Sequence, residues 1–171
     1  MRVRALIGIA AAAVVLLVVA VAPSGAVPGG TFKASLIGYE EVPAISTVAT
    51  GTFEAKIAET ATGPVIEYEL AYSGIPTTVL FAHIHLGQFS ANGGVSAFLC
   101  GGGDKPPCPA TSTGETPVTG TIDAADVIGP AGQGIAAGEI QELIDAMVFG
   151  VTYANVHSVA HPGGEIRGQI R

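Results

Sequence analysis

The feature that most constrains the fold is an alternation of apolar and polar residues that recurs in short segments along the chain. In 32–36, for example, apolar side chains alternate with Lys33 and Ser35. Successive side chains of a β-strand point to opposite faces, so this pattern predicts strands with one buried and one wet face. The segments that predict strands by alternation or by apolar and β-branched content are 32–36, 53–57, 65–72, 79–86, 118–122, 151–157 and 165–170.

These segments are separated by short stretches rich in turn-forming residues, and no linker divides them into two groups. Residues 73–76, Ser-Gly-Ile-Pro, have the composition of a turn and lie between the third and fourth predicted strands. Strands with one wet face and short connections are typical of antiparallel sheets. The sequence therefore predicts a single all-β domain over 27–171, built as an antiparallel β-sandwich.

One segment, 136–148, departs from the strand pattern. Its apolar residues recur at the spacing of one helix face, and Gly150 follows closely enough to end a helix. The residues that form this face are Ile140, Leu143, Ile144 and Met147. We expect a short amphipathic helix that packs on the core at one end or edge of the sandwich.

The N-terminal residues 1–26 have the features of a secretory signal peptide. Two arginines precede an apolar run over 5–22, and the small residues Ser24 and Ala26 resemble a cleavage site after Ala26. The run is also near the length that spans a bilayer, so an uncleaved anchor is the alternative. We expect cleavage, a secreted or extracytoplasmic protein, and no membrane span in the mature chain.

The charge balance argues against partners that are themselves strongly acidic. The chain has 14 acidic against 7 basic side chains and a formal net charge of -7. Nonspecific binding to nucleic acid or to an anionic membrane depends on clustered Lys and Arg that displace counterions. We therefore expect no nucleic-acid partner, and an extracellular protein or envelope component is the partner class that remains.

Export changes the interpretation of the two cysteines. Cys100 and Cys108 enclose a segment of glycine, proline and charged residues that predicts a loop. Outside the cytoplasm an even number of cysteines usually forms disulfides. We expect a Cys100–Cys108 disulfide that stabilises this loop. A redox or metal-binding thiol pair is the alternative, but the pair lacks C-x-x-C spacing.

All four histidines lie in two short segments. His83 and His85 are two residues apart on a predicted strand, so their side chains share one face and form a bidentate platform for a transition metal. If the strand that carries His157 is a neighbour, that residue completes a three-nitrogen site suited to Cu, Zn or Ni. His161 lies in the following turn and is a candidate fourth ligand. The alternative is that the histidines only make structural hydrogen bonds.

Other chemical signals are weak. The chain has no nucleophile elbow, phosphate-binding loop or H-E-x-x-H motif, so we assign no catalytic residues. Glu40 and Glu41 are adjacent carboxylates, but neighbouring residues on a strand point to opposite faces, which argues against a general acid/base pair. We interpret them as solvated or calcium-contacting loop carboxylates. Glu165 and Arg167 lie two apart on one strand face, where we expect them to pair with each other or with side chains of neighbouring strands.

Several of these motifs, taken in order, resemble the CHRD domain, a family first named in chordin and found in many secreted bacterial proteins. The matching residues are Glu41, Val42 and Pro43 (E-V-P), His83 and His85 (A-H-I-H), and Asn155, His157, Glu165 and Arg167 (N-V-H and G-E-I-R-G). The resemblance covers 31–171. It implies an extracellular all-β domain, immunoglobulin-like in fold, without an established activity or catalytic residues.

A more distant similarity concerns the copper-zinc superoxide dismutases, secreted β-sandwiches whose copper site begins with an H-x-H strand. The segment AHIHLG is similar in this detail. The zinc-binding loop of that family has no counterpart, because no histidine lies between His85 and His157. This similarity implies a single-metal site, and a dismutase-like redox enzyme is the weakest hypothesis.

Taken together, these features predict a secreted, disulfide-linked β-sandwich that acts as a non-enzymatic binding or envelope-associated module. The leading alternative is a Cu- or Zn-binding protein that uses His83, His85, His157 and His161. Bound metal distinguishes these hypotheses, and redox turnover of that metal distinguishes the second from a dismutase-like enzyme.

Overall fold

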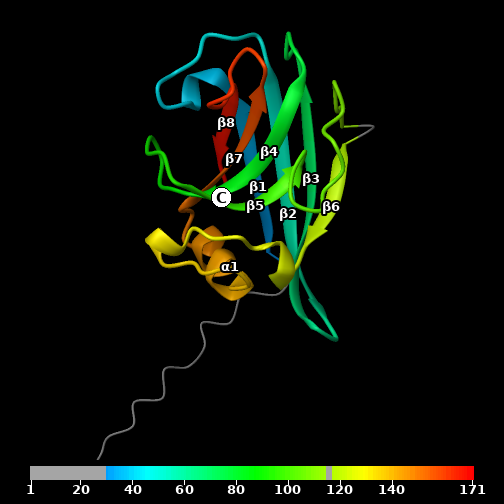
Figure 1. Ribbon diagram of the computed structural model, residues 1–171, viewed down its shortest axis with the longest axis vertical. Helices are drawn as coiled ribbons and strands as arrows, with labels where there is room; N and C mark the ends of the chain where they lie inside the picture. Colours follow the sequence, from blue (N-terminus) through cyan, green and yellow to red (C-terminus); the bar gives the residue numbers. More distant parts are fainter. Residues whose placement is uncertain (1–29, 115–116) are drawn as a thin grey trace, which may run out of the picture.

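The computed structural model describes residues 30–114 and 117–171, and the predicted signal peptide lies outside these residues (Figure 1). The described part is built from eight strands. These are β1 (Thr31–Ile37), β2 (Thr50–Thr60), β3 (Gly63–Ser73), β4 (Val79–Leu86), β5 (Gly94–Cys100), β6 (Val118–Ile122), β7 (Thr152–Ser158) and β8 (Ile166–Gln169). Each of the seven predicted strand segments corresponds to one of them. β5 was not predicted, because its start is glycine-rich and resembles a loop.

The strands form one antiparallel sheet in the order β5-β4-β7-β8-β1-β2-β3-β6. Its two edge strands, β5 and β6, approach each other, so that the sheet nearly closes into a barrel (Figure 1). The all-β antiparallel class is thus confirmed. The sandwich form stays a prediction, because the strands belong to one continuous hydrogen-bonded sheet.

The long β2–β3 hairpin shows the alternation that the sequence predicts. Phe53, Ala55 and Ile57 on β2 are buried, whereas Glu54 and Lys56 between them are exposed. β3 pairs with β2 along the whole length of both strands. The buried side chains of this hairpin join one hydrophobic core with those of β4, β7 and the helix. Burial of apolar area on this inner face is the main stabilising contribution.

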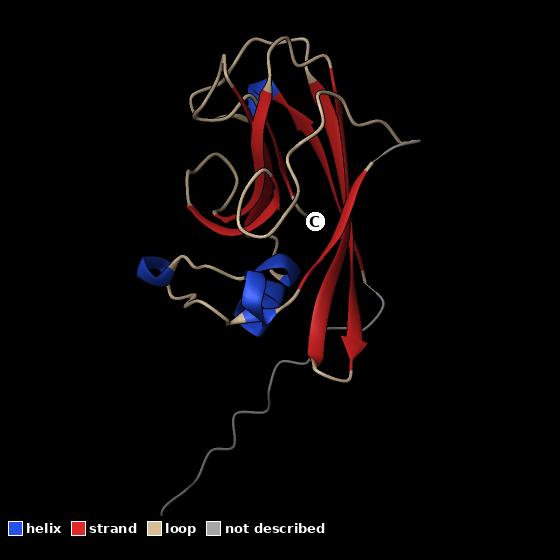
Figure 2. Ribbon diagram, turned by 45° about the vertical axis from the view of Figure 1, so that its right-hand side comes forward, coloured by secondary structure: helices blue, strands red, loops and turns tan. Residues whose placement is uncertain are grey.

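The predicted helix is confirmed but begins later than expected. α1 (Ile140–Val148) buries the four apolar residues of the predicted face and lies at one end of the sheet (Figures 1 and 2). Residues 136–139 form a turn instead, in which the Glu139 carboxylate accepts a hydrogen bond from the Ala136 amide. At the other end, Gly150 has a φ of +67° and its amide donates to Met147, which ends the helix.

The remaining helical segments are single 3-10 turns. They are η1 (Gly38–Glu40), η2 (Ala124–Asp126) and η3 (Ala131–Gln133). Within 30–114 and 117–171, no helix combines the length and the apolar character needed to cross a membrane.

The strands β4, β7 and β8 differ from the amphipathic hairpin because both of their faces are covered. All seven residues of β7 and all four of β8 are buried. The expectation that the histidine face of these strands is wet is therefore wrong. Connecting segments cover it: the β4–β5 loop, 87–93, receives hydrogen bonds from Arg167, and the segment after η1 places Glu41 against Asn155.

Candidate metal centre

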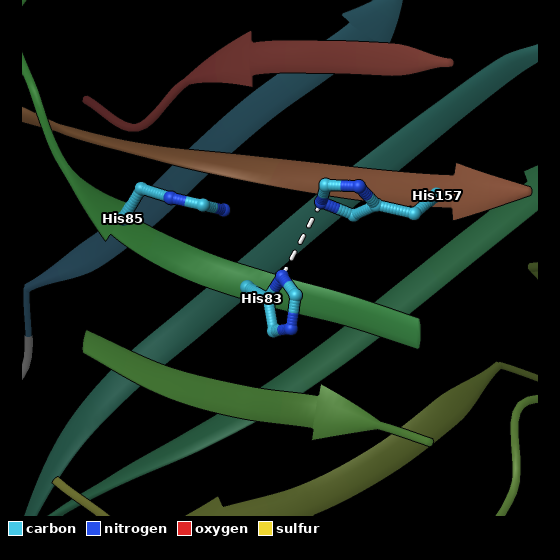
Figure 3. Close-up of side chains that lie close together, drawn as sticks. All are labelled: His83, His85 and His157. Atoms are coloured by element: carbon cyan, nitrogen blue, oxygen red, sulfur yellow. Dashed lines mark hydrogen bonds between the residues drawn. The ribbon is translucent and has the colours of Figure 1, made fainter. Parts of the chain in front are cut away.

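Three of the four histidines lie together on the covered face of the sheet. β4 directs Ala82 and Ile84 into the core, with no exposed area, and therefore directs His83 and His85 to the opposite face. β7 is the antiparallel neighbour of β4 and places His157 opposite Phe81. The two histidine strands are therefore neighbours, which is the condition that the sequence left open, and Figure 3 shows the three imidazoles converging from these strands.

The cluster is compact and buried. One ligand atom of each histidine lies within 4.8 Å of those of the other two, and His83 Nδ1 is 3.3 Å from His157 Nε2 (Figure 3). The three side chains are only 5–7% exposed. Three imidazoles at such separations and burial form a nitrogen-lined site rather than a set of surface histidines.

Two backbone carbonyls orient the rings. His85 Nδ1 lies 3.1 Å from the Gly93 carbonyl oxygen, and His157 Nδ1 lies 3.0 Å from that of Pro162. A carbonyl oxygen only accepts hydrogen bonds, so in both neutral rings Nδ1 carries the proton and Nε2 carries the lone pair. His85 Nε2 is buried without a hydrogen-bond partner in the described structure. A carbonyl partner at Nδ1 is typical of histidines that ligate metals through Nε2.

Aromatic side chains enclose the cluster. The Phe98 ring lies 4.5 Å from that of His83, and the Phe81 ring lies 4.8 Å from that of His157, measured between centroids. His85 is stacked on Tyr153 at 4.6 Å with an interplanar angle of 4°. These contacts limit the rotamers of the imidazoles and contribute to their burial.

Burial keeps all three histidines neutral. It is the largest cause of the shift that lowers the pKa of His83 from 6.5 to about 3, and the neighbouring histidines add to it. Burial also lowers the pKa of His85 to about 4 and lowers that of His157, against the raising effect of their carbonyl partners. At neutral pH each ring therefore offers a lone pair, which is the form that binds a metal.

The fourth histidine does not join this cluster. The group of possible ligands in the described residues contains His83, His85 and His157 but not His161. The backbone of His161 shapes the β7–β8 turn instead, because its carbonyl accepts hydrogen bonds from the amides of Ser158 and Gly164. Its side chain is half-buried.

Glu41 is not the solvated loop carboxylate that the sequence analysis expects. It is 8% exposed and accepts a short hydrogen bond from Asn155, whose amide also donates to the Ile166 carbonyl. Burial raises the pKa of Glu41 to about 7, although Asn155 and the charge of Arg167 oppose the shift. Pro43, two residues further along the chain, follows a cis peptide bond. The E-V-P and N-V-H motifs thus meet in one buried contact.

The expected pairing of Glu165 with Arg167 is absent from the described structure. Both residues are buried, but Glu165 accepts hydrogen bonds from the hydroxyls of Thr47 and Ser158. Arg167 donates to the carbonyls of Ala91 at 2.8 Å and Gln88 at 3.2 Å. The two side chains thus have separate partners. Glu165 binds Ser158 of the neighbouring strand β7 as well as Thr47, so the expected alternative of pairing with a neighbouring strand holds for Glu165, whereas Arg167 binds carbonyls of the β4–β5 loop.

The predicted disulfide is confirmed. Cys100 and Cys108 are bonded with their Cα atoms 5.0 Å apart, so neither thiol is free. Inside the closed loop, Lys105 forms an ion pair with Asp126 at 2.7 Å and ties the loop to η2. The disulfide therefore stabilises the end of β5, the strand that carries Phe98 beside His83.

The arrangement is suited to binding one metal ion through three nitrogens. Metal–nitrogen bonds of about 2.0–2.1 Å place the nitrogens of a tetrahedral site roughly 3.3–3.4 Å apart. The separation between His83 Nδ1 and His157 Nε2 already has this value, and His85 has to move inward. A site with three protein nitrogens leaves a fourth coordination position open.

The groups that orient and enclose the three histidines were not predicted from the sequence. Gly93 is the clearest example, because a Cβ at this position would lie 1.6 Å from the Leu86 carbonyl oxygen, so no other residue is accommodated. The adjacent glycines 93 and 94, soon after an H-x-H strand, are the only signal in the sequence. The carbonyl of Pro162 and the placement of Phe98 gave none, because they depend on register and loop closure.

Comparisons with known proteins agree with the motif order. A family model described as the CHRD domain matches residues 32–170, which is nearly all of the described chain. No curated protein matches significantly. No solved structure matches significantly either.

Proposed function

The chain belongs to the CHRD domain family, and we propose that it is an exported β-domain that binds one transition-metal ion, copper in preference to zinc, through His83, His85 and His157. The observation that carries the proposal is the set of three buried, neutral imidazoles whose nitrogens face one another. His85 Nε2 in particular is desolvated and has no hydrogen-bond partner. A bound cation supplies the missing partner.

A purely structural role accounts for less of this geometry. A buried polar nitrogen without a partner costs about 1–3 kcal/mol, and structural histidine clusters avoid that cost by pairing each nitrogen. Here one hydrogen bond joins His83 to His157, whereas His85 Nε2 has no hydrogen-bond partner in the described structure. On metal binding the proton of His83 moves to Nε2, so that Nδ1 becomes a ligand in place of this hydrogen bond.

The donor set favours copper. Imidazole binds Cu, Zn and Ni, and among divalent ions of the first transition row copper has the highest affinity for a given set of nitrogen ligands. The cluster contains no carboxylate or thiolate within the described residues. Hard ions such as Mg²⁺ and Ca²⁺, which require oxygen ligands, are therefore excluded as the preferred ion.

The export and the binding role rest on other features. The apolar segment 5–22 supports secretion, and the Cys100–Cys108 disulfide is compatible with an oxidising compartment. We assign binding rather than catalysis, because the three histidines are nearly inaccessible to a substrate. An extracellular protein or envelope component remains the expected partner class.

Elemental analysis of the protein, purified from an exported fraction without a histidine tag or chelator, tests the proposal. We expect near-stoichiometric copper, or uptake of added Cu in competition with a chelator, and loss of both in the His83→Ala, His85→Ala double variant. His161→Ala is the matched control and should retain the metal. Protein that folds, as judged by near-UV circular dichroism, but takes up neither Cu nor Zn contradicts the proposal.

A further inference from the structure

Arg167 places a buried positive charge beside the histidine cluster. Its side chain is 2% exposed, and it lies on β8 opposite Asn155 of β7. The guanidinium carbon is 3.4 Å from the centroid of the Tyr153 ring, a cation–π contact. Arg167 is thus held within the same covered face as the three histidines.

Only the Tyr153 ring separates this charge from His85. β7 lies between β4 and β8 in the sheet, so Tyr153 has His85 on one side and Arg167 on the other. His85 stacks on the ring at 4.6 Å. Because the imidazole and the guanidinium both lie against this one ring, the imidazole experiences the field of the guanidinium.

This charge is only partly compensated. Within 30–114 and 117–171, Arg167 forms no ion pair, and its donors go to loop carbonyls and to Asn92 Oδ1. Arg167 interacts electrostatically with Glu41, whose carboxyl has a pKa of about 7 and is therefore incompletely ionised at neutral pH. The histidines themselves are neutral ligands. A metal ion that enters the cluster adds its charge to this positive environment.

We infer that Arg167 biases the site toward Cu(I) over Cu(II), acting through the field across Tyr153 rather than as a ligand. The inference rests on the proposed copper-binding function and specifies the oxidation state that the site prefers. The two ions differ by one unit of charge, so a fixed neighbouring charge changes their relative affinities. At this separation in a partly buried environment the effect is on the order of tenfold.

The test measures the affinity of the full mature chain for each ion separately. Cu(I) is titrated against a chelator under anaerobic conditions with ascorbate, which spares the Cys100–Cys108 disulfide better than a thiol reductant, and Cu(II) is titrated in air at the same pH. The measured quantity is the ratio of the Cu(II) to the Cu(I) dissociation constant. We expect Arg167→Gln to lower this ratio about tenfold, equivalent to about 60 mV in midpoint potential.

Three further variants separate charge from structure. Arg167→Lys keeps the charge and should retain most of the wild-type ratio. Gln169→Leu removes a neutral side chain that also holds the β4–β5 loop, through the Gly87 carbonyl, and should change both affinities by the same factor. Glu41→Gln, measured at pH 8 where Glu41 is ionised, removes a negative charge and should raise the ratio of the two dissociation constants. This variant replaces Arg167→Gln in the test if Arg167→Gln does not fold.

The outcomes distinguish a failure of the proposed copper binding from a failure of the proposed charge effect of Arg167. Wild-type protein that binds neither copper ion overturns the proposed function. Wild-type protein that binds both, with Arg167→Gln or Glu41→Gln changing the two affinities equally, overturns the inference alone. A ratio in Arg167→Lys equal to that of Arg167→Gln overturns it as well, because the charge is then not the cause.

Discussion

The β2–β3 hairpin and the β4–β7–β8 part of the sheet bury their side chains in different ways. On β2 the alternate residues from Phe53 to Ile57 are buried, and those between them are exposed. On β7 every residue from Thr152 to Ser158 is buried, although the sequence alternates there as well. The hairpin uses one face for the core. The second region uses one face for the core and the other for a polar, histidine-containing interior.

The difference shows how this fold accommodates a site. An alternating pattern indicates which residues face the core, but it does not indicate whether the opposite face is exposed to water or covered by a loop. In the second region the opposite face is covered by segments that its own polar side chains bind, including Arg167 to the Ala91 carbonyl and Asn155 to Glu41. Polar residues on that face therefore stabilise the fold, whereas those of the hairpin do not.

The largest expected effect is on the core face of the hairpin. Phe53 has no exposed area, so Phe53→Ala removes a fully buried ring and leaves a cavity. We expect a loss of about 3–5 kcal/mol in the free energy of unfolding, measured by urea denaturation. A loss below 1 kcal/mol contradicts the placement of this face in the core.

The second-largest expected effect is a loss of stability in the polar interior of the β4–β7–β8 region. Asn155→Leu keeps the volume of the side chain but leaves the Glu41 carboxyl and the Ile166 carbonyl without their amide donor. We expect a loss of about 3 kcal/mol in the same measurement, because unpaired buried polar groups are costly. Thr52 on the exposed face of β2 is the control position, and Thr52→Leu should change stability little. Equal small effects at both positions contradict the account.

The buried carboxyl also predicts a pH dependence for metal-free protein. Burial raises the pKa of Glu41 from 4.5 to about 7, so its contribution to stability is fully present below pH 4.5 and is lost as the pH rises through 7. Glu41→Gln stays neutral and lacks this loss. The variant should therefore gain about 3 kcal/mol relative to wild type between pH 4.5 and pH 8. A constant difference across that range means that Glu41 is not desolvated.

The smallest effect is on the wet face of the hairpin. Glu54 pairs with Lys33 at 2.7 Å, but both side chains are at least half exposed. We expect Glu54→Ala to change the free energy of unfolding by less than about 0.5 kcal/mol, since exposed ion pairs contribute little. Thermal denaturation at low and high salt checks this. A loss as large as that of Asn155→Leu removes the distinction between the two regions.

Much of the hairpin was predictable because its information is local. Alternation in 53–57 and 65–72 identifies both strands and their buried faces, and the periodicity around Leu143 identifies the helix. β5 was missed because small residues and glycines carry little pattern. Strand order also has no local signal, so the closure of β5 toward β6 required the structure.

The candidate site was predictable only in part. The spacing of His83 and His85 determines that they share a face. The sequence proposes His157 as the third ligand only if its strand is a neighbour, and the structure shows that it is. The burial of the site, the separation of His161 from it and the orientation of Glu165 and Arg167 depend on which loops cover the sheet. These are long-range contacts that one-dimensional patterns do not encode.

The most direct test of the histidine centre is imidazole nitrogen NMR of the isotope-labelled protein, without metal and then with Zn(II) or Cu(I), which are both diamagnetic. In the metal-free protein we predict neutral rings with the proton on Nδ1 for His83, His85 and His157. On loading, His85 and His157 should keep that proton and bind through Nε2, while the proton of His83 moves to Nε2. His161 should not change. Unaltered resonances of the three clustered histidines after addition of either metal contradict the proposed metal centre.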